Sequence, residues 1–431
     1  MTERTIAVNY LARVEGEGAL KVRIHDRTVE EVQLKIFEPP RFFEAFLRGR
    51  SYREAPDITA RICGICPVAY QMSSCNAMEQ ALGISVTGPL RELRRLLYCG
   101  EWIESHALHI YLLHAPDFLG FPDAIQLAKA HPEAVQKGLA LKKVGNALMT
   151  LLGGREIHPV NVRVGGFYRC PSREELEGIR PDLVHALRLA EETVHFTAGL
   201  TFPKIEEDYE FVSMRHPDEY PLTEGDLVSN RGLRIPVSKY EEEFEEIHVA
   251  HSNALQSVRK GGGSYLVGPL ARYALNRDRL PPRARKLAQD VGLEPVVTNP
   301  YRSIIVRAIE TVFACEEALR IIDAYRPPPA PFVPPPAKLV AAVGAGVSEA
   351  PRGTLYHRYR LDANGLIEEA KIVAPTSQNQ KRIEDDLRGV VTRSLDLDEA
   401  ALTSMCERAI RNHDPCISCA THFLDLELIR D

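Results

Sequence analysis

The chain has 431 residues, of which 45% are hydrophobic and 26% are charged, the usual balance of a soluble globular protein. A chain of this length buries enough apolar surface to be stable without disulfides. Its 53 lysines and arginines and 59 aspartates and glutamates leave a formal charge of −6, and no block of five or more basic residues occurs. This composition argues against a nucleic-acid-binding protein built on a basic face.

The sequence predicts neither a targeting segment nor a membrane span. Residues 1–18 contain no apolar core of signal-peptide length, and they include Glu15 and Glu17. The uncharged apolar runs of the chain are much shorter than the ~20 residues that a bilayer crossing requires. We therefore expect a cytoplasmic protein.

The first forty residues (1–40) predict a small antiparallel β-hairpin region. Hydrophobic and charged residues alternate over 20–24 and again over 32–36, on either side of the turn HDRT. Two prolines then end the pairing, and residues 42–48 predict a short helix.

From Pro67 onward the hydrophobic periodicity becomes helical, with apolar residues at spacings of three, four and seven. Long helices are predicted at 67–82, 89–114, 133–152, 173–199 and 301–325. Helices of this length, packed in antiparallel fashion, form a bundle. We expect this bundle core to cover 61–325 within one domain that spans 1–431.

Three further segments complete the predicted architecture. The proline-rich segment 326–336 must be extended and predicts a stiff polyproline II spacer, although it could also be a ligand for a proline-reading domain. An Asn-Gly pair predicts a β-hairpin within 350–380, and 396–431 predicts a last helix and a metal-binding tail. The expected fold class is α+β, mainly α: a long antiparallel helix bundle with small peripheral antiparallel sheets.

The nine cysteines are too few for a disulfide scaffold in a chain of this length, but four of them are paired. Cys63 and Cys66 form one C-x-x-C, and Cys416 and Cys419 form another. Such pairs predict reduced thiols with metal or redox functions. Pro67 suits a first helical position, and the N-terminus of that helix would favour a thiolate at Cys66.

Four thiolates are soft ligands that suit zinc, an iron–sulfur cluster, or nickel and iron. A structural zinc site with four cysteine ligands is one interpretation. Zinc ribbons, however, place their cysteine pairs some ~15–20 residues apart, whereas Cys66 and Cys416 are 350 positions apart. A site that joins both ends of a large helical domain lies at its centre, which favours a buried functional centre.

Both cysteine motifs also carry a family resemblance. RICGIC (61–66) and DPCISCATH (414–422) resemble the two signature motifs of the large, catalytic subunit of nickel–iron hydrogenases. Further segments resemble the family in the family's order: ARVEGEG (12–18), PPRFFEA (39–45), ESHALHIYLL (104–113), IHPVNVRVGGF (157–167), EAPRGTLYH (349–357) and VAPTSQN (373–379). The phrases PRFFEA and IESHALHIYLL look most like the soluble, NAD(P)-linked sulfhydrogenase branch.

The resemblance implies that Cys63, Cys66, Cys416 and Cys419 hold nickel. It also implies that Cys66 and Cys419 bridge to an iron with carbonyl and cyanide ligands. The substrate would be dihydrogen, cleaved into a hydride and a proton. Because dihydrogen has no charge and forms no hydrogen bonds, the protein can supply only an apolar route, a metal acting as a Lewis acid, and a nearby base. That base would be Cys416 or Arg352.

Other polar residues acquire roles from the same resemblance. Glu15 would carry the proton away from the metals, and burial would raise its pKa for that purpose; the other interpretation is a strand-end glutamate in a surface ion pair. Arg352 would place a fixed positive charge next to the cyanides, and Asp414 could orient it. Ser105 stands where many relatives have aspartate.

A second ion site is implied by the same family. Glu44 and His422, with a backbone carbonyl near Ile372 and several waters, would bind Mg²⁺ or Fe²⁺, and Mg²⁺ prefers such oxygen ligands. A maturation protease usually cuts directly after the family's equivalent of His422. We therefore expect the nine residues 423–431 to be removed.

The resemblance also implies partner proteins. Beyond the four ligands the chain has no cluster-binding cysteine motif, so electrons would leave through an iron–sulfur small subunit. The branch implies a flavin-containing NAD(P) diaphorase and ferredoxin-like subunits as well. Two alternatives stay open: a non-catalytic electron-transfer scaffold like the quinone-side subunit of respiratory complex I, and a structural zinc protein.

Several other features predict no functional site. His106 and His109 share a helix face and are expected to be core histidines. The glycine-rich segment 260–268 lacks the ending of a phosphate loop and predicts a turn, and the acidic run 241–246 predicts a solvated helix face. The remaining cysteines are expected to be small buried side chains: Cys75, Cys99, Cys170, Cys315 and Cys406.

Overall fold

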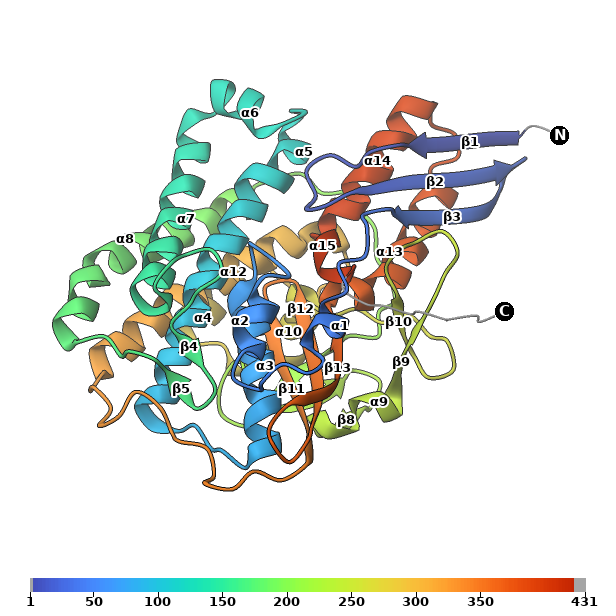
Figure 1. The fold of residues 1–431 in the computed structure, drawn as a ribbon. Coiled ribbons are helices and arrows are strands. Elements are labelled where there is room, and N and C mark those ends of the chain that lie inside the picture. Colours follow the sequence, from blue (N-terminus) through green and yellow to red (C-terminus); the bar gives the residue numbers. More distant parts are fainter. Residues whose placement is uncertain (1–2, 422–431) are drawn as a thin grey trace, which may run out of the picture.

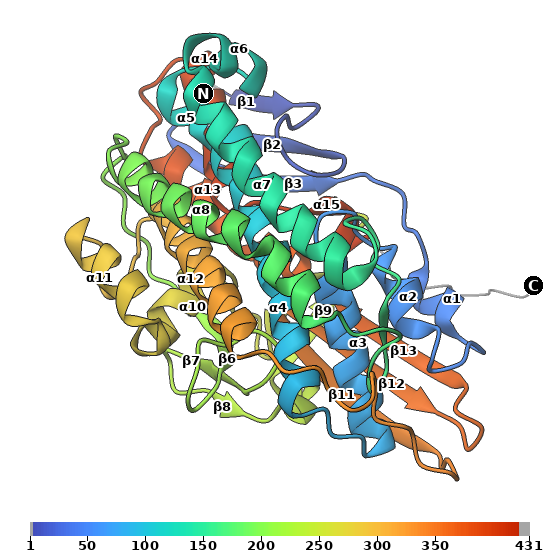
Figure 2. The ribbon, with the colours of Figure 1, turned by 90° about the vertical axis from the view of Figure 1, so that its left-hand side faces the viewer.

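A group of long helices forms the centre of the computed structural model, which describes residues 3–421 (Figure 1). They are α3 (Pro67–Leu82), α4 (Gly88–Leu108), α7 (Pro132–Gly153), α8 (Arg173–Ala198) and α12 (Ser303–Ala324). Helix α4 packs against α7 and α12, and α8 packs against the same two helices, so the four lie alongside one another (Figure 2). The prediction of a mainly α protein with a helical core is confirmed.

The helix boundaries follow the hydrophobic periodicity and the expected capping residues. Helix α3 begins at Pro67 and ends at Leu82, and the next residue, Gly83, adopts the left-handed conformation with φ of 65°. The predicted helix 89–114 is different, because α4 ends at Leu108 and continues as the π-helical turn η1 (His109–His114). Pro116, in the next helix (Ala115–Leu119), has no backbone N–H and cannot donate an α-helical hydrogen bond. This favours an interruption of the α-helical pattern just before it.

Two of the three three-stranded antiparallel sheets in the described residues flank the helices. The first contains β1 (Glu3–Val8), β2 (Gly18–His25) and β3 (Thr28–Ile36). The second contains β11 (Ala342–Ala350), β12 (Gly353–Leu361) and β13 (Ile367–Val373). The hairpins β2–β3 and β12–β13 match the predicted alternation and turns, whereas β1 and β11 are additional strands.

Strand β11 packs directly on helix α3 because its glycines have no side chains. A Cβ on Gly344 would lie 2.0 Å from the backbone oxygen of Ala77, and one on Gly346 would lie 2.4 Å from the backbone nitrogen of Ala77. Such a glycine-rich strand has no alternating hydrophobic pattern, so the sequence gives little sign of it.

The remaining elements are short or connect the core to the sheets. They are α1 (Phe43–Leu47), α2 (Ala55–Ala60), α5 (Ala115–Leu119), α6 (Ala124–Ala130), β4 (Val162–Arg163), β5 (Gly166–Phe167), β6 (Val212–Arg215), β7 (Asp226–Ser229), β8 (Arg234–Ile235), η2 (Val237–Lys239), α9 (Tyr240–Glu243), β9 (Phe244–Ile247), β10 (Gln256–Arg259), α10 (Pro269–Asn276), η3 (Arg277–Arg279), α11 (Pro282–Asp290), η4 (Pro300–Arg302), α13 (Pro375–Thr392), α14 (Glu399–Asn412) and α15 (Ile417–Ala420). No helix within residues 3–421 is both long and apolar enough to cross a bilayer.

The acidic run 241–246 is not the solvated helix face that its charges predict. The chain leaves α9 and enters strand β9 at Phe244, whose side chain is buried. Glu241 accepts hydrogen bonds from the Tyr356 hydroxyl and the Arg358 guanidinium. The run therefore includes a core residue, part of a strand that pairs with β10, and a side-chain partner of strand β12. These tertiary contacts outweigh the local helical preference.

The proline-rich segment 326–336 packs on the β4–β5 hairpin. The Phe167 N–H donates to the Pro331 carbonyl at 2.8 Å, and the Val333 N–H donates to the Gly165 carbonyl at 2.9 Å. The Arg163 guanidinium lies 3.7 Å from the centre of the Phe332 ring. The segment is thus a docked crossing, in keeping with a spacer, and its backbone is already engaged.

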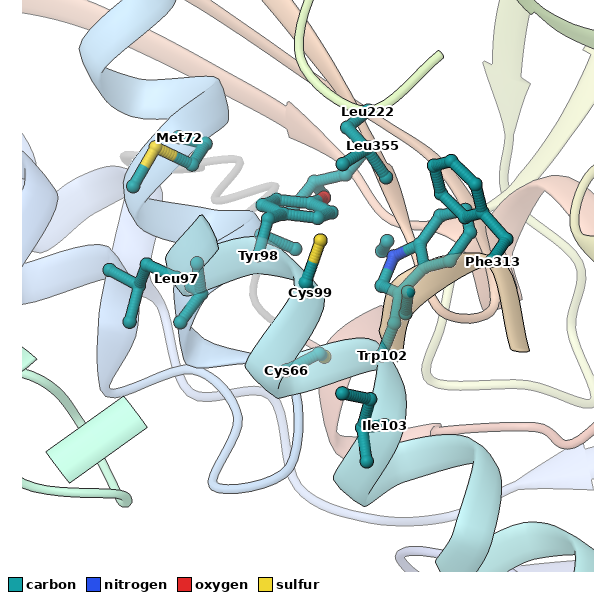
Figure 3. Close-up of a cluster of buried hydrophobic side chains, with 14 of the residues drawn as sticks. Cys66, Met72, Leu97, Tyr98, Cys99, Trp102, Ile103, Leu222, Phe313 and Leu355 are labelled. Atoms are coloured by element: carbon teal, nitrogen blue, oxygen red, sulfur yellow. The ribbon is translucent and has the colours of Figure 1, made fainter. Parts of the chain in front are cut away.

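Two hydrophobic clusters hold the parts together. The large cluster lies between the long helices and the β11–β13 sheet and includes Cys66 and Trp102 (Figure 3). A second cluster joins the N-terminal sheet to α13 and α14, through residues such as Val22 and Leu387. The opening and closing parts of the chain are therefore neighbours in space, as Figure 1 shows.

The contact between β11 and α3 predicts the effect of a single methyl group. We expect Gly344→Ala to lower the free energy of unfolding by about 1–3 kcal/mol, because the backbone of α3 must move to admit it. Gly178→Ala is the matched control, since Gly178 is an exposed helical residue with open space around its Cβ position, and alanine favours a helix. Denaturant unfolding curves measure both; equal stability of the G344A variant and the parent would contradict the packing.

Candidate metal centre

The two C-x-x-C motifs come together in one buried site. The sulfur atoms of Cys63, Cys66, Cys416 and Cys419 all lie within 4.8 Å of one another. The Sγ atoms of Cys63 and Cys416 are 3.5 Å apart, and those of Cys66 and Cys419 are 3.6 Å apart. Four buried sulfur donors at these separations fit a thiolate-bound metal centre.

Each motif places its cysteines at the start of a helix. Cys63 lies in the loop before α3, and Cys66 is the N-cap residue of that helix. Cys416 precedes the short helix α15, and Cys419 lies within it. The Cys416 N–H donates to the Thr376 hydroxyl at 2.9 Å, which fixes the second motif against α13.

Arg41 joins the two motifs, a role that no sequence pattern predicts. Its guanidinium donates to the carbonyl of Ile62 at 2.7 Å and to the carbonyl of Ser418. These carbonyls belong to the neighbours of Cys63 and Cys419. In the sequence, Arg41 is marked only by its position in the PPRFFEA segment, three residues before Glu44.

The four thiols influence one another's ionisation. Hydrogen bonds from Cys416, Cys419 and Cys66 hold the pKa of Cys63 well below its usual value. A hydrogen bond with Cys416 lowers the pKa of Cys66, but contacts with Cys419 and Cys63, together with burial, raise that pKa well above its usual value. The helix N-terminus is therefore not the only influence on Cys66, and the thiolate predicted there stays a prediction.

A carboxylate already caps the N-terminus of helix α3. Glu101 of α4 is fully buried and accepts hydrogen bonds from the N–H groups of Val68 at 2.6 Å and Ala69 at 3.2 Å. These are among the free N–H groups that give a helix N-terminus its positive character. Glu101 occupies them, so they are not available to stabilise a thiolate at Cys66.

Glu15 contacts the second cysteine motif directly. One carboxylate oxygen accepts from the Cys416 thiol and from the Ser418 N–H, both at 3.0 Å. A buried carboxyl is expected, but the Glu15 side chain is only half-buried, because it lies in the loop between β1 and β2. Glu15 takes part in no ion pair with any of residues 3–421, so the alternative of a surface ion pair is not what the structure shows.

Arg352 lies beside the cysteines and is held by Asp414. Its Nε donates to the Asp414 carbonyl at 2.9 Å, and Nη2 donates to the Asp414 carboxylate at 3.1 Å. Nη1 lies 3.5 Å from the Ser105 hydroxyl. Burial acts to lower the pKa of Arg352, but the negative charges of Asp414 and Cys416 raise it well above its usual value. The guanidinium is therefore a permanent positive charge at the site.

The structure brings Glu44 to Ile372. The Ile372 N–H donates to the Glu44 carboxylate at 2.7 Å. Burial raises the pKa of Glu44 to about 7, even though this hydrogen bond lowers it. His422 and the tail 423–431 lie outside the described residues.

The core histidines behave as expected. His106 Nε2 is 3.0 Å from the Glu310 carboxylate, and His109 Nε2 is 2.9 Å from the Arg411 carbonyl, to which it donates. Both rings are fully buried. Each therefore has a protein partner and serves as a packed polar residue of the bundle.

Comparisons with known proteins agree with this site. The chain matches the family described as nickel-dependent hydrogenase over residues 41–140 and 255–422. Among curated proteins it is 34% identical to sulfhydrogenase 1 subunit alpha of Pyrococcus furiosus, over 98% of each chain. It is 35% identical to sulfhydrogenase 2 subunit alpha of the same organism, over 98% of this chain and 100% of that one.

A solved structure is similar over almost the full length. An NAD⁺-reducing [NiFe]-hydrogenase in the H₂-reduced state superimposes with a TM-score of 0.85 at 26% identity, over 97% of this chain and 99% of that one. The alternatives of a structural zinc protein and of a complex-I-like scaffold do not account for these matches.

A buried carboxyl next to the site predicts a pH effect on stability. Burial raises the pKa of Glu104 to about 7, above its unfolded value of ~4.3, although Lys142 lies 2.7 Å away and lowers it. The folded state therefore binds this proton more tightly, so Glu104 makes stability fall as pH rises from about 4.5 to beyond 7.

We expect Glu104→Gln to reduce that fall by about 1–3 kcal/mol between pH 5 and 8. Denaturant unfolding at a series of pH values measures it. Glu177→Gln, which changes an exposed helical carboxylate, is the control and should keep the parent's pH dependence. An unchanged pH slope in the E104Q variant would contradict the assignment.

Proposed function

This chain belongs to the nickel-dependent hydrogenase family, and on that premise we propose the roles of its individual residues and partners. It is the catalytic subunit of a hydrogenase, which cleaves H₂ to protons and electrons at a nickel–iron centre. The observation that carries this function is the meeting of four buried sulfurs, within 4.8 Å, from motifs at opposite ends of the chain. When bound, the metal centre supplies the Lewis-acid and redox chemistry of the reaction.

The four cysteines are the proposed ligands of that centre. Cys63, Cys66, Cys416 and Cys419 would hold nickel, and Cys66 and Cys419 would be shared with iron. The sulfurs of this last pair are 3.6 Å apart, close enough for both to contact one further metal, and the choice of this pair rests on the family resemblance. Because the site is lined by packed apolar side chains of the main core, water is largely excluded from it.

Proton transfer is proposed to run from Cys416 to Glu15. The Cys416 sulfur is 3.0 Å from the Glu15 carboxylate, which is hydrogen-bonding distance for sulfur. The Ser418 N–H fixes the same carboxylate oxygen. Since Glu15 is half-buried, a proton that reaches it can pass outward to water or to a partner.

Arg352 and Asp414 are proposed to form the polar side of the site. The permanent charge of Arg352 would stabilise the iron's carbonyl and cyanide ligands, which are part of this proposal. Asp414 accepts two hydrogen bonds from Arg352 and would keep its guanidinium in place. Ser105 approaches from α4 and replaces the family's usual aspartate with an uncharged hydroxyl.

A second ion, Mg²⁺ or Fe²⁺, is proposed at Glu44, with His422 and the backbone carbonyl of Ile372 as further ligands. The contact of Glu44 with the Ile372 N–H places this carboxylate next to that part of β13. We also propose that a maturation protease removes residues 423–431 after His422.

The partners are proposed from the relatives. Two of these are alpha subunits of sulfhydrogenases, and another is the beta subunit of the NAD-reducing hydrogenase HoxS of Cupriavidus necator, 27% identical over 98% of this chain and 95% of that one. We propose an iron–sulfur small subunit, a flavin-containing NAD(P) diaphorase, ferredoxin-like subunits and a cytoplasmic location.

The metal assignment is tested on the purified complex. We expect elemental analysis to find nickel and iron, and the infrared spectrum to show bands of iron-bound carbonyl and cyanide. Cys66→Ser should abolish H₂ oxidation and remove most of the nickel. Cys75→Ser is the matched control, because Cys75 is equally buried on the same helix but lies outside the four-sulfur group. One zinc and no nickel or iron would contradict the assignment.

The proton route predicts a selective defect. Glu15→Gln should lower H₂ oxidation about 100-fold, because the amide cannot accept the proton, while metal content and infrared bands stay as in the parent. Glu17→Gln changes the exposed neighbouring carboxylate and should retain nearly full activity. Parent-like H₂ oxidation by the E15Q variant would exclude this route.

A further inference from the structure

We propose that Arg272 is a positioning residue that holds Arg352 at the metal site by clamping the backbone immediately before it. This inference rests on the proposed function of Arg352. Arg272 lies on α10, at a distance in the sequence from every proposed site residue, and is fully buried.

Arg272 uses all five of its N–H donors. Nη1 donates to the Ala350 carbonyl at 2.8 Å and to the Glu349 carboxylate at 3.1 Å. Nη2 donates to the Pro351 carbonyl at 2.9 Å and to the Glu310 carboxylate at 2.8 Å. Nε donates to the other Glu310 oxygen at 2.8 Å. The two carboxylates hold the guanidinium, and the guanidinium holds two consecutive carbonyls.

Those carbonyls belong to the tight turn that presents Arg352. Strands β11 and β12 pair up to Ala350 and Gly353, so Pro351 and Arg352 are the two residues of the connecting turn. A turn residue has few backbone restraints of its own. The bonds from Arg272 therefore determine where the turn, and with it the Arg352 side chain, lies.

Trp102 extends the clamp to a third carbonyl. Its indole N–H donates to the Glu349 carbonyl at 2.9 Å, and the Arg272 guanidinium stacks 4.4 Å from the Trp102 ring centre. Figure 3 shows Trp102 packed in the core beside Phe313. Three consecutive carbonyls, those of residues 349–351, thus accept from rigid buried donors.

The loop before α10 meets the same turn from another direction. A Cβ on Gly268 would lie 2.7 Å from the Arg352 carbonyl oxygen, and one on Gly353 would lie 2.8 Å from the Gly268 nitrogen. The backbones of the two segments are therefore in direct contact. Helix α10 positions Arg352 both through the Arg272 side chain and through this close approach.

Only a planar guanidinium can make this arrangement. A lysine in place of Arg272 has three donors on one nitrogen and cannot reach two carboxylates and two carbonyls at once. We expect Arg272→Lys to lower kcat for H₂ oxidation by the purified complex about tenfold or more, because a small displacement of a catalytic group has a large effect on rate.

The control is another buried arginine with a similar set of partners. Arg95 is 1% exposed and donates to Glu317, Glu219 and the Tyr220 carbonyl, and it makes no contact with the turn. Arg95→Lys should destabilise the protein to a comparable extent, measured by its melting temperature. Its kcat should stay within about twofold of the parent's.

A double-mutant cycle separates positioning from general structural damage. Because Arg272 is inferred to act through Arg352, adding R272K to an R352K variant should change kcat by less than about twofold. Hydrogen–deuterium exchange gives a second readout, independent of activity: peptides that cover 349–354 should exchange faster in R272K and unchanged in R95K.

Three outcomes would overturn the inference: equal losses from R272K in both backgrounds, an R95K variant as impaired as R272K, or unchanged exchange over 349–354. If R272K does not fold, Trp102→Phe tests the same clamp, since it removes the N–H to the Glu349 carbonyl together with one ring of the indole that stacks on Arg272. It should speed exchange over 349–354, and unchanged exchange would overturn the inference. If the R352K variant keeps the parent's kcat, the proposed role of Arg352 itself is wrong. If R352K has a lowered kcat but R272K keeps the parent's kcat, only the inferred role of Arg272 is wrong.

Discussion

The metal site depends on one constraint, the attachment of the closing segment of the fold to its opening segment. The Ile417 N–H donates to the Glu15 carbonyl at 2.9 Å, as a bridge between two otherwise distant strands of chain. Arg41 adds bonds to a carbonyl in each cysteine motif, and a hydrophobic cluster joins the N-terminal sheet to α13 and α14. Without this attachment the two sulfur pairs would be separate dithiols, and no four-sulfur ligand set would exist.

Much of the fold follows from local sequence patterns, because helices and hairpins are specified by nearby residues. The 3.6-residue periodicity and the terminal Pro67 and Gly83 predict α3 to the residue, and the Asn-Gly turn predicts the β12–β13 hairpin. Strand β11 could not be predicted in this way, since its fit depends on the backbone of α3. The charges of 241–246 predict a solvated helix face for a similar reason, because the partners of Glu241 lie more than a hundred residues away.

The residues of the candidate site differ in the same way: some are recognisable in the sequence, and others only in the folded structure. The four cysteines, Glu15, Glu44 and Arg352 lie in recognisable motifs. Arg41 shares a motif with Glu44, and Glu101 and Arg272 lie outside the motifs. The importance of these three residues comes only from the groups that they meet: two motif carbonyls, the N-terminus of α3, and the turn before Arg352. Their side-chain types are common on protein surfaces, so only the folded structure distinguishes them. Such supporting residues determine how well the recognisable ones are placed.

The long stretch of chain between the two cysteine pairs also has a consequence for biosynthesis. At translation rates of about 5–20 residues per second, Cys63 and Cys66 leave the ribosome roughly 20–70 s before Cys416 and Cys419. During that interval the nascent chain carries a dithiol with no partners, exposed to oxidants and to competing cations such as zinc. Selective loading with nickel therefore has to follow elongation, and the cell must shield the early thiols until the late ones arrive.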